Sequence, residues 1–438
     1  MLKTLQNAFK VKDVRHRIFY VLMMLVVIRI GSQLPVPGVD GSYFKTWFES
    51  QTGDAFNFLD AFTGGSFSQM SIFALSITPY ITSSIIIQLL TIAIPKLEEM
   101  QRDGEDGRKK LGAITRYVTI GLSLFESIAM AIGFGNKGLI PDNSFVKMVV
   151  VVVALTAGSA FLMWVGEQIN EKGVGNGISI VLLINIVSRI PSDMTKLYES
   201  FMKGKIIAKA LLSGVIIAAI IVGVVILVII LNGAERRIPV QYSKKMQGRK
   251  MRGGQSSHIP LKVNTAGVIP VIFASSIMSF PSVIASFLGK TGGTGIGGKI
   301  LAGMNSNNWF DLEHPWYSIG LVAYIVMVIF FAYFYTSITF NPLEVADNMK
   351  KQGGFIPGIR PGKPTVEYLT KILNYIIFVG ACGLVLIQLV PIIFNGWLGA
   401  SVSFGGTSLI IIVSVILETL KQIESQMLVR NYKGFLNK

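Results

Sequence analysis

The sequence predicts an all-α polytopic membrane protein with ten transmembrane helices in two inverted five-helix halves, and with a re-entrant helix. Three observations predict this class. Hydrophobic residues make up 51% of the 438 residues, enough for ten spans of about 20 apolar residues each. Charged residues make up 15%, below the roughly 25% of an ordinary soluble domain. Long apolar runs also recur along the chain, interrupted by charges, glycine and proline.

The ten candidate spans share an apolar run bounded by polar residues or turn formers. They lie at about 18–34, 72–94, 118–134, 148–165, 178–190, 210–231, 264–288, 316–340, 373–394 and 406–420. The first run continues past Arg29 without a small-residue cleavage site and ends at Pro35 and Pro37, so we expect a retained helix and not a signal peptide. An even number of spans places both termini on one side.

The basic residues decide which side that is. If the termini are cytoplasmic, 29 of the 40 Lys and Arg lie in cytoplasmic segments and 10 lie in the opposite ones. The two sets of segments have similar lengths, so this split is a strong positive-inside signal. We therefore expect both termini to be cytoplasmic, and the cytoplasmic segments then hold much of the excess behind the net charge of +16.

The halves of the chain echo each other. Two spans are short, with 13 residues each, at Ile178–Ile190 and Ser408–Leu420, and both follow glycine-rich turns. Proline, isoleucine and a serine pair recur in Ile77–Ile85 and Ile269–Ile277. Five spans per half would invert the second half relative to the first and place a working site between them. The alternative is that proline, serine and glycine are simply common in membrane helices.

The expected organisation follows from these spans. It comprises a cytoplasmic segment 1–17, an N-terminal half 18–190, an external connector 191–209, a C-terminal half 210–420 with basic cytoplasmic loops 232–263 and 341–371, and a tail 421–438.

Catalytic signatures are missing from the sequence. It has no GxxxxGK[ST], HExxH or GxSxG motif, its three histidines lie outside the spans and far apart, and Cys382 is its single cysteine. We therefore expect no enzyme activity, no cofactor and no metal site.

The polar residues inside the spans are mainly hydroxyl and amide side chains, and Glu126 is the acid that sits well within a span. Interhelical contacts of such groups are weak enough to part and re-form, although ordinary packing of small residues explains many of them equally well. Glu126 has three interpretations, as a hydrogen-bonding group of a polar gate, as a protonated structural residue, or as a proton carrier.

Two further segments have functional interpretations. Residues 56–62, followed by Gly64 and Gly65, form a stretch too short to cross, either a half-helix that caps a pore from outside or an amphipathic surface helix. The loop 232–263 has eight basic residues and one acid, and 341–371 presents Arg360 among glycines and prolines. Anionic lipid, ribosomal RNA or an acidic protein surface would each suit these loops.

The order and position of longer motifs resemble the SecY family, the channel subunit of the Sec protein translocase, over nearly the whole chain. The motifs are Arg29-Ile30-Gly31, Ser71-Ile72-Phe73-Ala74-Leu75, Gly166-Glu167-Gln168, Gly175-Asn176-Gly177, Gln255-Ser256-Ser257-His258, Phe340-Asn341-Pro342, Ala346-Asp347-Asn348, Pro357-Gly358-Ile359-Arg360-Pro361-Gly362 and Phe404-Gly405-Gly406-Thr407-Ser408.

The resemblance implies four sets of site residues. An apolar pore ring would consist of Ile77, Ile81, Leu182, Ile186, Ile272 and Ile411. A plug at 56–68 would include Phe56, Asn57, Phe58, Leu59, Asp60, Phe62, Gly64 and Gly65. The lateral gate would include Thr82, Ser83, Ser84, Glu126, Asn264, Ser275 and Ser276, where many relatives have an amide in place of Glu126. Docking of SecA or the ribosome would use Arg236, Arg237, Arg249, Lys250 and Arg360.

The resemblance also implies the function and the partners. It implies a channel that passes unfolded preproteins outward and releases hydrophobic segments into membrane lipid through the lateral gate. The implied partners are SecE, SecG, the SecA ATPase, the ribosome and preproteins with signal sequences, and no DNA. The alternative function is a proton- or ion-coupled small-solute transporter, which would depend on Glu126.

Overall fold

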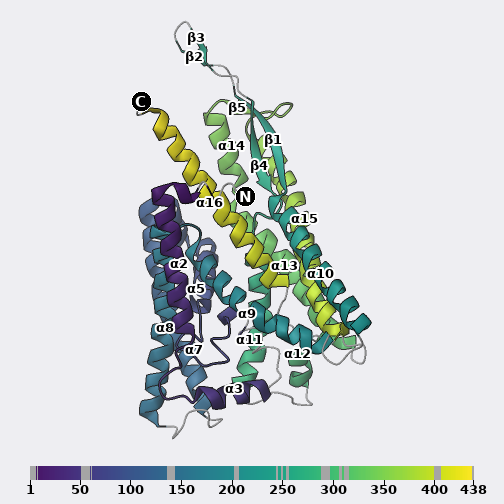
Figure 1. The fold of residues 1–438 in the computed structure, drawn as a ribbon. Helices are drawn as coiled ribbons and strands as arrows, with labels where there is room; N and C mark the ends of the chain where they lie inside the picture. Colours follow the sequence, from purple (N-terminus) through teal and green to yellow (C-terminus); the bar gives the residue numbers. More distant parts are fainter. Residues whose placement is uncertain are drawn as a thin grey trace. The chain divides into compact units, whose positions relative to one another are not determined.

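The computed structural model describes residues 6, 8–50, 60, 62–135, 144–201, 207–242, 245–247, 250–252, 256–287, 296–304, 308–309, 315–398 and 406–436. Its elements are shown in Figure 1. The chain divides into two compact units, of which unit 1 comprises Met1–Lys196, Pro281–Gly298 and Val415–Lys438, and unit 2 comprises Leu197–Phe280 and Lys299–Ser414. Each of the ten predicted spans overlaps a helix.

Unit 1 consists mainly of helices in its described residues. Its elements are α2 (Lys12–Ser32), α3 (Gly41–Ser50), α5 (Thr78–Ala93), α6 (Pro95–Arg102), α7 (Glu105–Gly135), α8 (Phe145–Lys172), most of α9 (Gly177–Phe201) and most of α16 (Gly406–Leu436), with the end of α11 (Ile269–Phe287) and the first residues of α12 (Ile296–Met304). Helix α7 packs against α5 and α8, and α8 also packs against α2. The buried stripe of α7 consists of small hydroxyl residues, Thr115, Thr119, Ser123 and Ser127, which allow close approach of neighbouring helices.

Unit 2 combines helices with a small sheet. Its elements are α10 (Ile207–Gly233), β1 (Glu235–Tyr242), β2 (Lys245–Gln247), β3 (Lys250–Arg252), β4 (Ser256–Lys262), most of α11 (Ile269–Phe287), part of α12 (Ile296–Met304), η3 (Pro315–Tyr317), α13 (Ser318–Thr339), α14 (Pro342–Lys351), β5 (Gly354–Phe355), α15 (Lys363–Leu398) and the start of α16 (Gly406–Leu436). Helix α15 packs against α10, α13 and α14.

Six described helices are long and apolar enough to cross a membrane, and the α5–α6 pair adds a seventh if it is one broken span. That pair bends by 107°. The bend follows from Pro95, because proline disfavours the helical conformation for the residue before it, and Ile94 is extended with φ −114° and ψ 110°. At its other end, the predicted span 72–94 becomes helical only at Thr78.

The helices at the fifth and tenth spans are longer than the 13 residues expected for each span. Helix α9 has 25 residues and continues through Pro191 to Phe201, into the expected connector, and α16 has 31 residues and reaches Leu436. Apolar character ends at Pro191 and near Glu418, but a helix does not require apolar residues, since its backbone hydrogen bonds continue on polar residues. The part of the internal echo that rested on two short spans therefore loses its support.

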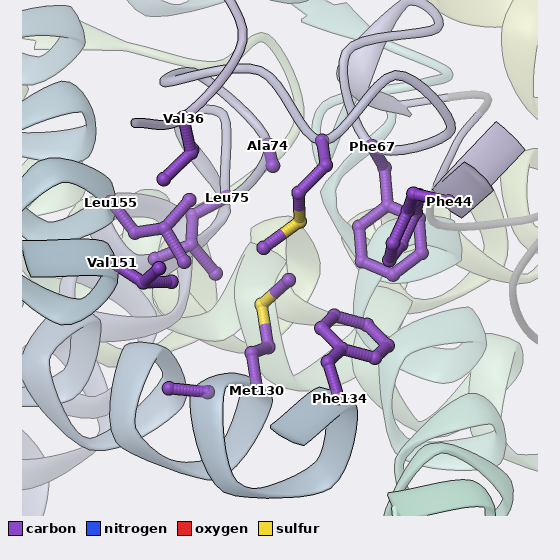
Figure 2. Close-up of a cluster of buried hydrophobic side chains, with 11 residues drawn as sticks. Val36, Phe44, Phe67, Ala74, Leu75, Met130, Phe134, Val151 and Leu155 are labelled. Carbon is purple, nitrogen blue, oxygen red and sulfur yellow. The ribbon is translucent and has the colours of Figure 1, made fainter. Parts of the chain in front are cut away.

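A buried cluster in unit 1 fixes the segment that enters α5. Phe67, Met70, Ala74 and Leu75 of this segment pack with Val36 and Phe44 and with Met130, Ala131 and Phe134 of α7 and Val151 and Leu155 of α8. Figure 2 shows Phe44, Phe67 and Phe134 gathered on one side of the cluster. The rings of Phe44 and Phe134 meet edge to face, with centroids 4.9 Å apart. Residues 67–75 are therefore held firmly among the helices of unit 1.

Candidate functional site

A buried ion pair joins the expected plug segment to α9. The carboxylate oxygen Oδ2 of Asp60 lies 2.5 Å from Nη1 of Arg189, and the two side chains are 5% and 9% exposed. Asp193, one helical turn further along α9, lies 3.9 Å from the other terminal nitrogen of Arg189. Asp60 therefore binds a guanidinium that α9 presents and that a second carboxylate positions.

Asn185 adds hydrogen bonds one turn earlier on α9. Its buried amide nitrogen donates to the hydroxyl of Ser76 at 2.9 Å and to the carbonyl of Phe62 at 3.3 Å. One side chain thus holds both ends of the segment 62–76. Without these partners the amide would lose its hydrogen bonds inside the protein, which costs about 1–3 kcal/mol.

Helix α2 contributes Arg29 to the same region. Its guanidinium donates to the hydroxyl of Ser188 at 3.0 Å and to the carbonyl of Gly64 at 3.5 Å. The Ser188 hydroxyl also lies 3.3 Å from the Gly64 carbonyl. Gly64 has φ +68°, and a Cβ there would collide with the backbone of Asn185, so only glycine fits this approach.

Local hydrogen bonds shape the described end of the plug segment. The Ser68 amide donates to Oδ1 of Asp60 at 2.8 Å, and the Phe67 amide donates to the Thr63 hydroxyl at 3.1 Å. Two non-glycine residues, Met70 and Ser76, hold positive φ angles of 45° and 52°. Such strain persists only where the surroundings fix the backbone, and both residues are almost fully buried.

Only part of the expected plug can be located. Phe56, Asn57, Phe58 and Leu59 lie outside the described residues, whereas Asp60, Phe62, Gly64 and Gly65 lie inside them. Phe62 and Asp60 are buried, and Gly65 follows Gly64 with a φ of +85°. The plug assignment of the segment remains a prediction.

The expected pore-ring residues belong to both units. In unit 1, Ile77, Leu182 and Ile186 are buried and Ile81 is half-buried. In unit 2, Ile411 is buried and Ile272 on α11 is half-buried. Ile77 directly precedes α5, whose first turn contains Pro79, a residue well suited to a helix start. The ring itself remains a prediction.

The expected gate residues are also divided between the units. Thr82 and Ser83 donate to the carbonyls of Thr78 and Pro79 on their own helix, at 3.1 and 2.7 Å. The half-buried Glu126 makes no hydrogen bond or ion pair with any other described residue. Ser84 and Ser276 are half-buried.

In unit 2 the amide of Asn264 donates to Oδ1 of Asn232 at 2.8 Å, and the amide of Asn232 donates to the Ser414 hydroxyl at 2.8 Å. The hydroxyls of Ser275 and Tyr324 lie 3.4 Å apart. Asn264 thus belongs to a chain of three polar side chains from α10, α16 and the turn before α11.

The two basic loops form one body in unit 2. Strand β1 pairs antiparallel with β4 and with β5, so Gln241 lies opposite Phe355 of the second loop. Beneath this sheet, Ile238 and Leu261 pack with Met349 of α14 and with Leu369 and Ile372 of α15. The first loop, for which the sequence predicted no strands, is therefore a β-hairpin.

Among the expected docking residues, Arg236, Arg237 and Arg360 are exposed, and Arg237 pairs with Glu235 at 2.7 Å. Lys250 lies on β3, whereas Arg249 lies outside the described residues. The described part of the chain contains no group of three or more His, Cys, Asp or Glu residues that would hold a metal ion.

Comparison with known proteins decides the family. The family model described as SecY matches residues 71–420. A protein of Halalkalibacterium halodurans is 44% identical over 443 residues, with all of both chains covered, and one of Bacillus subtilis is 45% identical over 449 residues with the same coverage. The chain belongs to the SecY family. Both relatives are named protein translocase subunit SecY.

The fold of this SecY-family chain also resembles solved structures. One described as "The structure of a protein conducting channel" aligns with a TM-score of 0.61, covering 94% of this chain and 92% of the other. Its sequence identity is 16%, so this likeness concerns the fold alone. The predicted class, a polytopic helical membrane protein of the SecY kind, is confirmed.

Sequence reasoning about this SecY-family member missed the partners of the plug segment. It assigned no role to Arg189 or Asp193, and it used Arg29 only as part of the first apolar run and of a family motif. A signal was present, because an Arg and an Asp four residues apart on a helix share one face and are costly next to an apolar run. The identity of Asp60 as the partner of Arg189 required the tertiary structure.

Proposed function

We propose that this SecY-family chain is the protein-conducting channel of a Sec translocase, which passes unfolded preproteins across a membrane. The observation that carries this is full-length identity of 44–45% to proteins named protein translocase subunit SecY. The chain is not an enzyme in this proposal, so the energy comes from a partner, either the SecA ATPase or a translating ribosome. SecE and SecG complete the complex.

The channel sits in the bacterial cytoplasmic membrane with both termini cytoplasmic. The excess of Lys and Arg in the alternate loops supports this orientation. Within the channel, the six ring residues form an apolar constriction, which resists ions because it dewets, yet offers a passing chain no specific hydrogen bonds. The segment 56–68 closes the constriction from outside.

The lateral gate of this proposal uses the candidate residues of α5, α7 and α11 and opens toward lipid. Hydroxyl side chains that bond their own helix, as Thr82 and Ser83 do, leave no strong bonds to break when helices part. A segment that reaches the gate then partitions by its own transfer free energy, which is favourable for leucine-rich helices and costs about 3 kcal/mol for a central charge.

The basic hairpin and the loop around Arg360 form the docking surface for SecA or the ribosome. The exposed side chains of Arg236 and Arg360 support this assignment, as does the sheet that joins the two loops. Anionic partners, whether acidic protein or ribosomal RNA, bind such a surface through charge.

Protease protection of a preprotein tests the proposed function. Vesicles containing this chain with SecE receive a signal-bearing preprotein, with and without SecA and ATP. We expect a protected preprotein only when the chain, SecA and ATP are all present. Absence of protection, with the Bacillus subtilis relative active in parallel, would contradict the channel function.

A further inference from the structure

Asp60 and the residues that lead into α5 are held by contacts of different kinds on the two sides of Gly64 and Gly65. Downstream, residues such as Phe67, Met70 and Leu75 are buried in an apolar cluster with α7 and α8. Upstream, Asp60 contacts α9 through charge. The glycine pair, with φ angles of +68° and +85°, lies between the fixed part and the charged part.

We infer that the buried ion pair of Asp60 and Arg189 is a releasable latch, which holds the plug segment on α9 while the channel is at rest. This inference rests on the proposed channel function. Arg189 is therefore a positioning residue that the family resemblance did not supply. The hydrogen bonds of Asn185 and Ser188 on the same helix complete the latch.

The chemistry of the pair suits a contact that must open. Burying two charges costs desolvation energy that their attraction only roughly repays, so a permanent anchor is better built from apolar side chains, as in the neighbouring cluster. If the segment leaves and water enters, both charges regain hydration. An apolar pair would instead be penalised by exposure. The ion pair therefore keeps both the seated and the released state accessible.

The backbone near the latch favours the same interpretation. Asp60 accepts from the Ser68 amide as well as from Arg189, so the carboxylate bridges the fixed part of the segment and α9. The strained Ser76, at φ +52°, is held by the amide of Asn185.

A thiol probe measures whether the segment is seated. Thr63 suits this purpose because it is 2% exposed and lies upstream of Gly64, in the part that the latch holds. We would introduce Thr63→Cys in a Cys382→Ala background and measure its reaction rate with a membrane-impermeant thiol reagent. No preprotein is present, so the measurement reports the resting state alone.

Removing one partner of the pair should unseat the segment. For Asp60→Asn we expect the labelling rate to rise at least about tenfold, because a buried guanidinium loses the nearer of its two counter-charges. Resting ion conductance in planar bilayers should rise in parallel. The double variant Asp60→Asn plus Arg189→Gln removes both charges of the pair, and the loss of Arg189 as a partner of Asp193 is common to this variant and to Arg189→Gln alone. The increase in the labelling rate of the double variant should therefore be smaller than the product of the increases in the two single variants.

The matched control is the pair of Arg116 and Glu167, which lie 2.6 Å apart in the same unit but are 52% and 24% exposed. Glu167→Gln should leave labelling and conductance unchanged. If Asp60→Asn does not accumulate in the membrane, Ser188→Ala removes a hydroxyl that contacts the Gly64 carbonyl and should raise labelling about threefold, as the loss of one hydrogen bond to the segment predicts.

Three outcomes would overturn the latch. They are unchanged labelling in the single variants, single effects that multiply fully in the double variant, and an equal response of Glu167→Gln. Preprotein protection, measured on the same vesicles, keeps the two proposals separate. Failure of the latch with intact protection leaves the channel function standing, whereas unprotected preprotein with the unaltered chain contradicts the function itself.

Discussion

Gly158 on α8 shows how a single side chain limits helix packing in unit 1. A Cβ at this position would collide with the backbone carbonyl of Ile72, in the segment that leads into α5. Backbone cannot yield as a flexible side chain does, so α8 requires glycine here. The close approach fixes the segment that ends at the start of α5.

We therefore expect Gly158→Ala to lower the stability of the protein in detergent, by about 1–3 kcal/mol, as for other overpacked sites. The measurement is the thermal unfolding midpoint. The control is Gly121→Ala on α7, where no atom lies within 4 Å of the added Cβ. This variant should be neutral or stabilising, because alanine favours helix over glycine by about 1 kcal/mol. Equal midpoints for the two variants would contradict the packing argument.

Glu126 separates the channel from the transporter alternative. A channel uses this residue at most for an interhelical hydrogen bond. The loss of such a bond costs about 0.6 kcal/mol, which changes an equilibrium constant roughly threefold. We expect Glu126→Gln to retain SecA-driven preprotein protection within that factor. The control is Glu171→Gln at an exposed position of α8. Complete loss of activity in Glu126→Gln alone would favour proton or ion coupling.

At the scale of elements, helix ends were the least predictable feature. The sequence located a helix at each of the ten apolar runs, because apolar length is set by the thickness of the membrane. It could not place the ends of α9 and α16, since helical hydrogen bonding continues past Pro191 and past the charges after Leu417. The sequence also did not predict the hairpin, because consecutive exposed basic residues interrupt the alternation of apolar and polar residues that would indicate a strand.

The sheet of β4, β1 and β5 gives a prediction about an element. Ile238 is 2% exposed beneath β1, and Gln241 lies on the opposite, exposed face. Ile238→Asp should unfold the sheet locally, because an uncompensated carboxylate under it costs several kcal/mol, on the order of 3. Hydrogen exchange of residues 235–242 would then become faster. Gln241→Asp adds the same charge outside and should preserve the slow exchange; similar rates in both variants would contradict the observed burial.

At the scale of the whole molecule, the pore ring makes a prediction about conductance. We expect Ile81→Asp plus Ile272→Asp to raise ion conductance of resting channels in planar bilayers by about tenfold, because carboxylates hydrate a constriction that otherwise dewets. The control is Leu343→Asp, which places a carboxylate on an exposed position of α14. Unchanged conductance in the double variant would remove these residues from the ring.

The amino-acid sequence by itself determined that this protein lies in a membrane, where along the chain its helices occur, and to which family it belongs. The apolar runs, the distribution of Lys and Arg and the long ordered motifs are all present in the sequence itself. A membrane favours apolar runs and orients flanking charges whatever the tertiary contacts are. The tertiary structure alone decided which polar groups meet. Asp60 and Arg189 are 129 residues apart, and no local pattern encodes a contact over that distance. Only the packing of the segment 62–77 against α9, α7 and α8 brings their charges together in a place that excludes water.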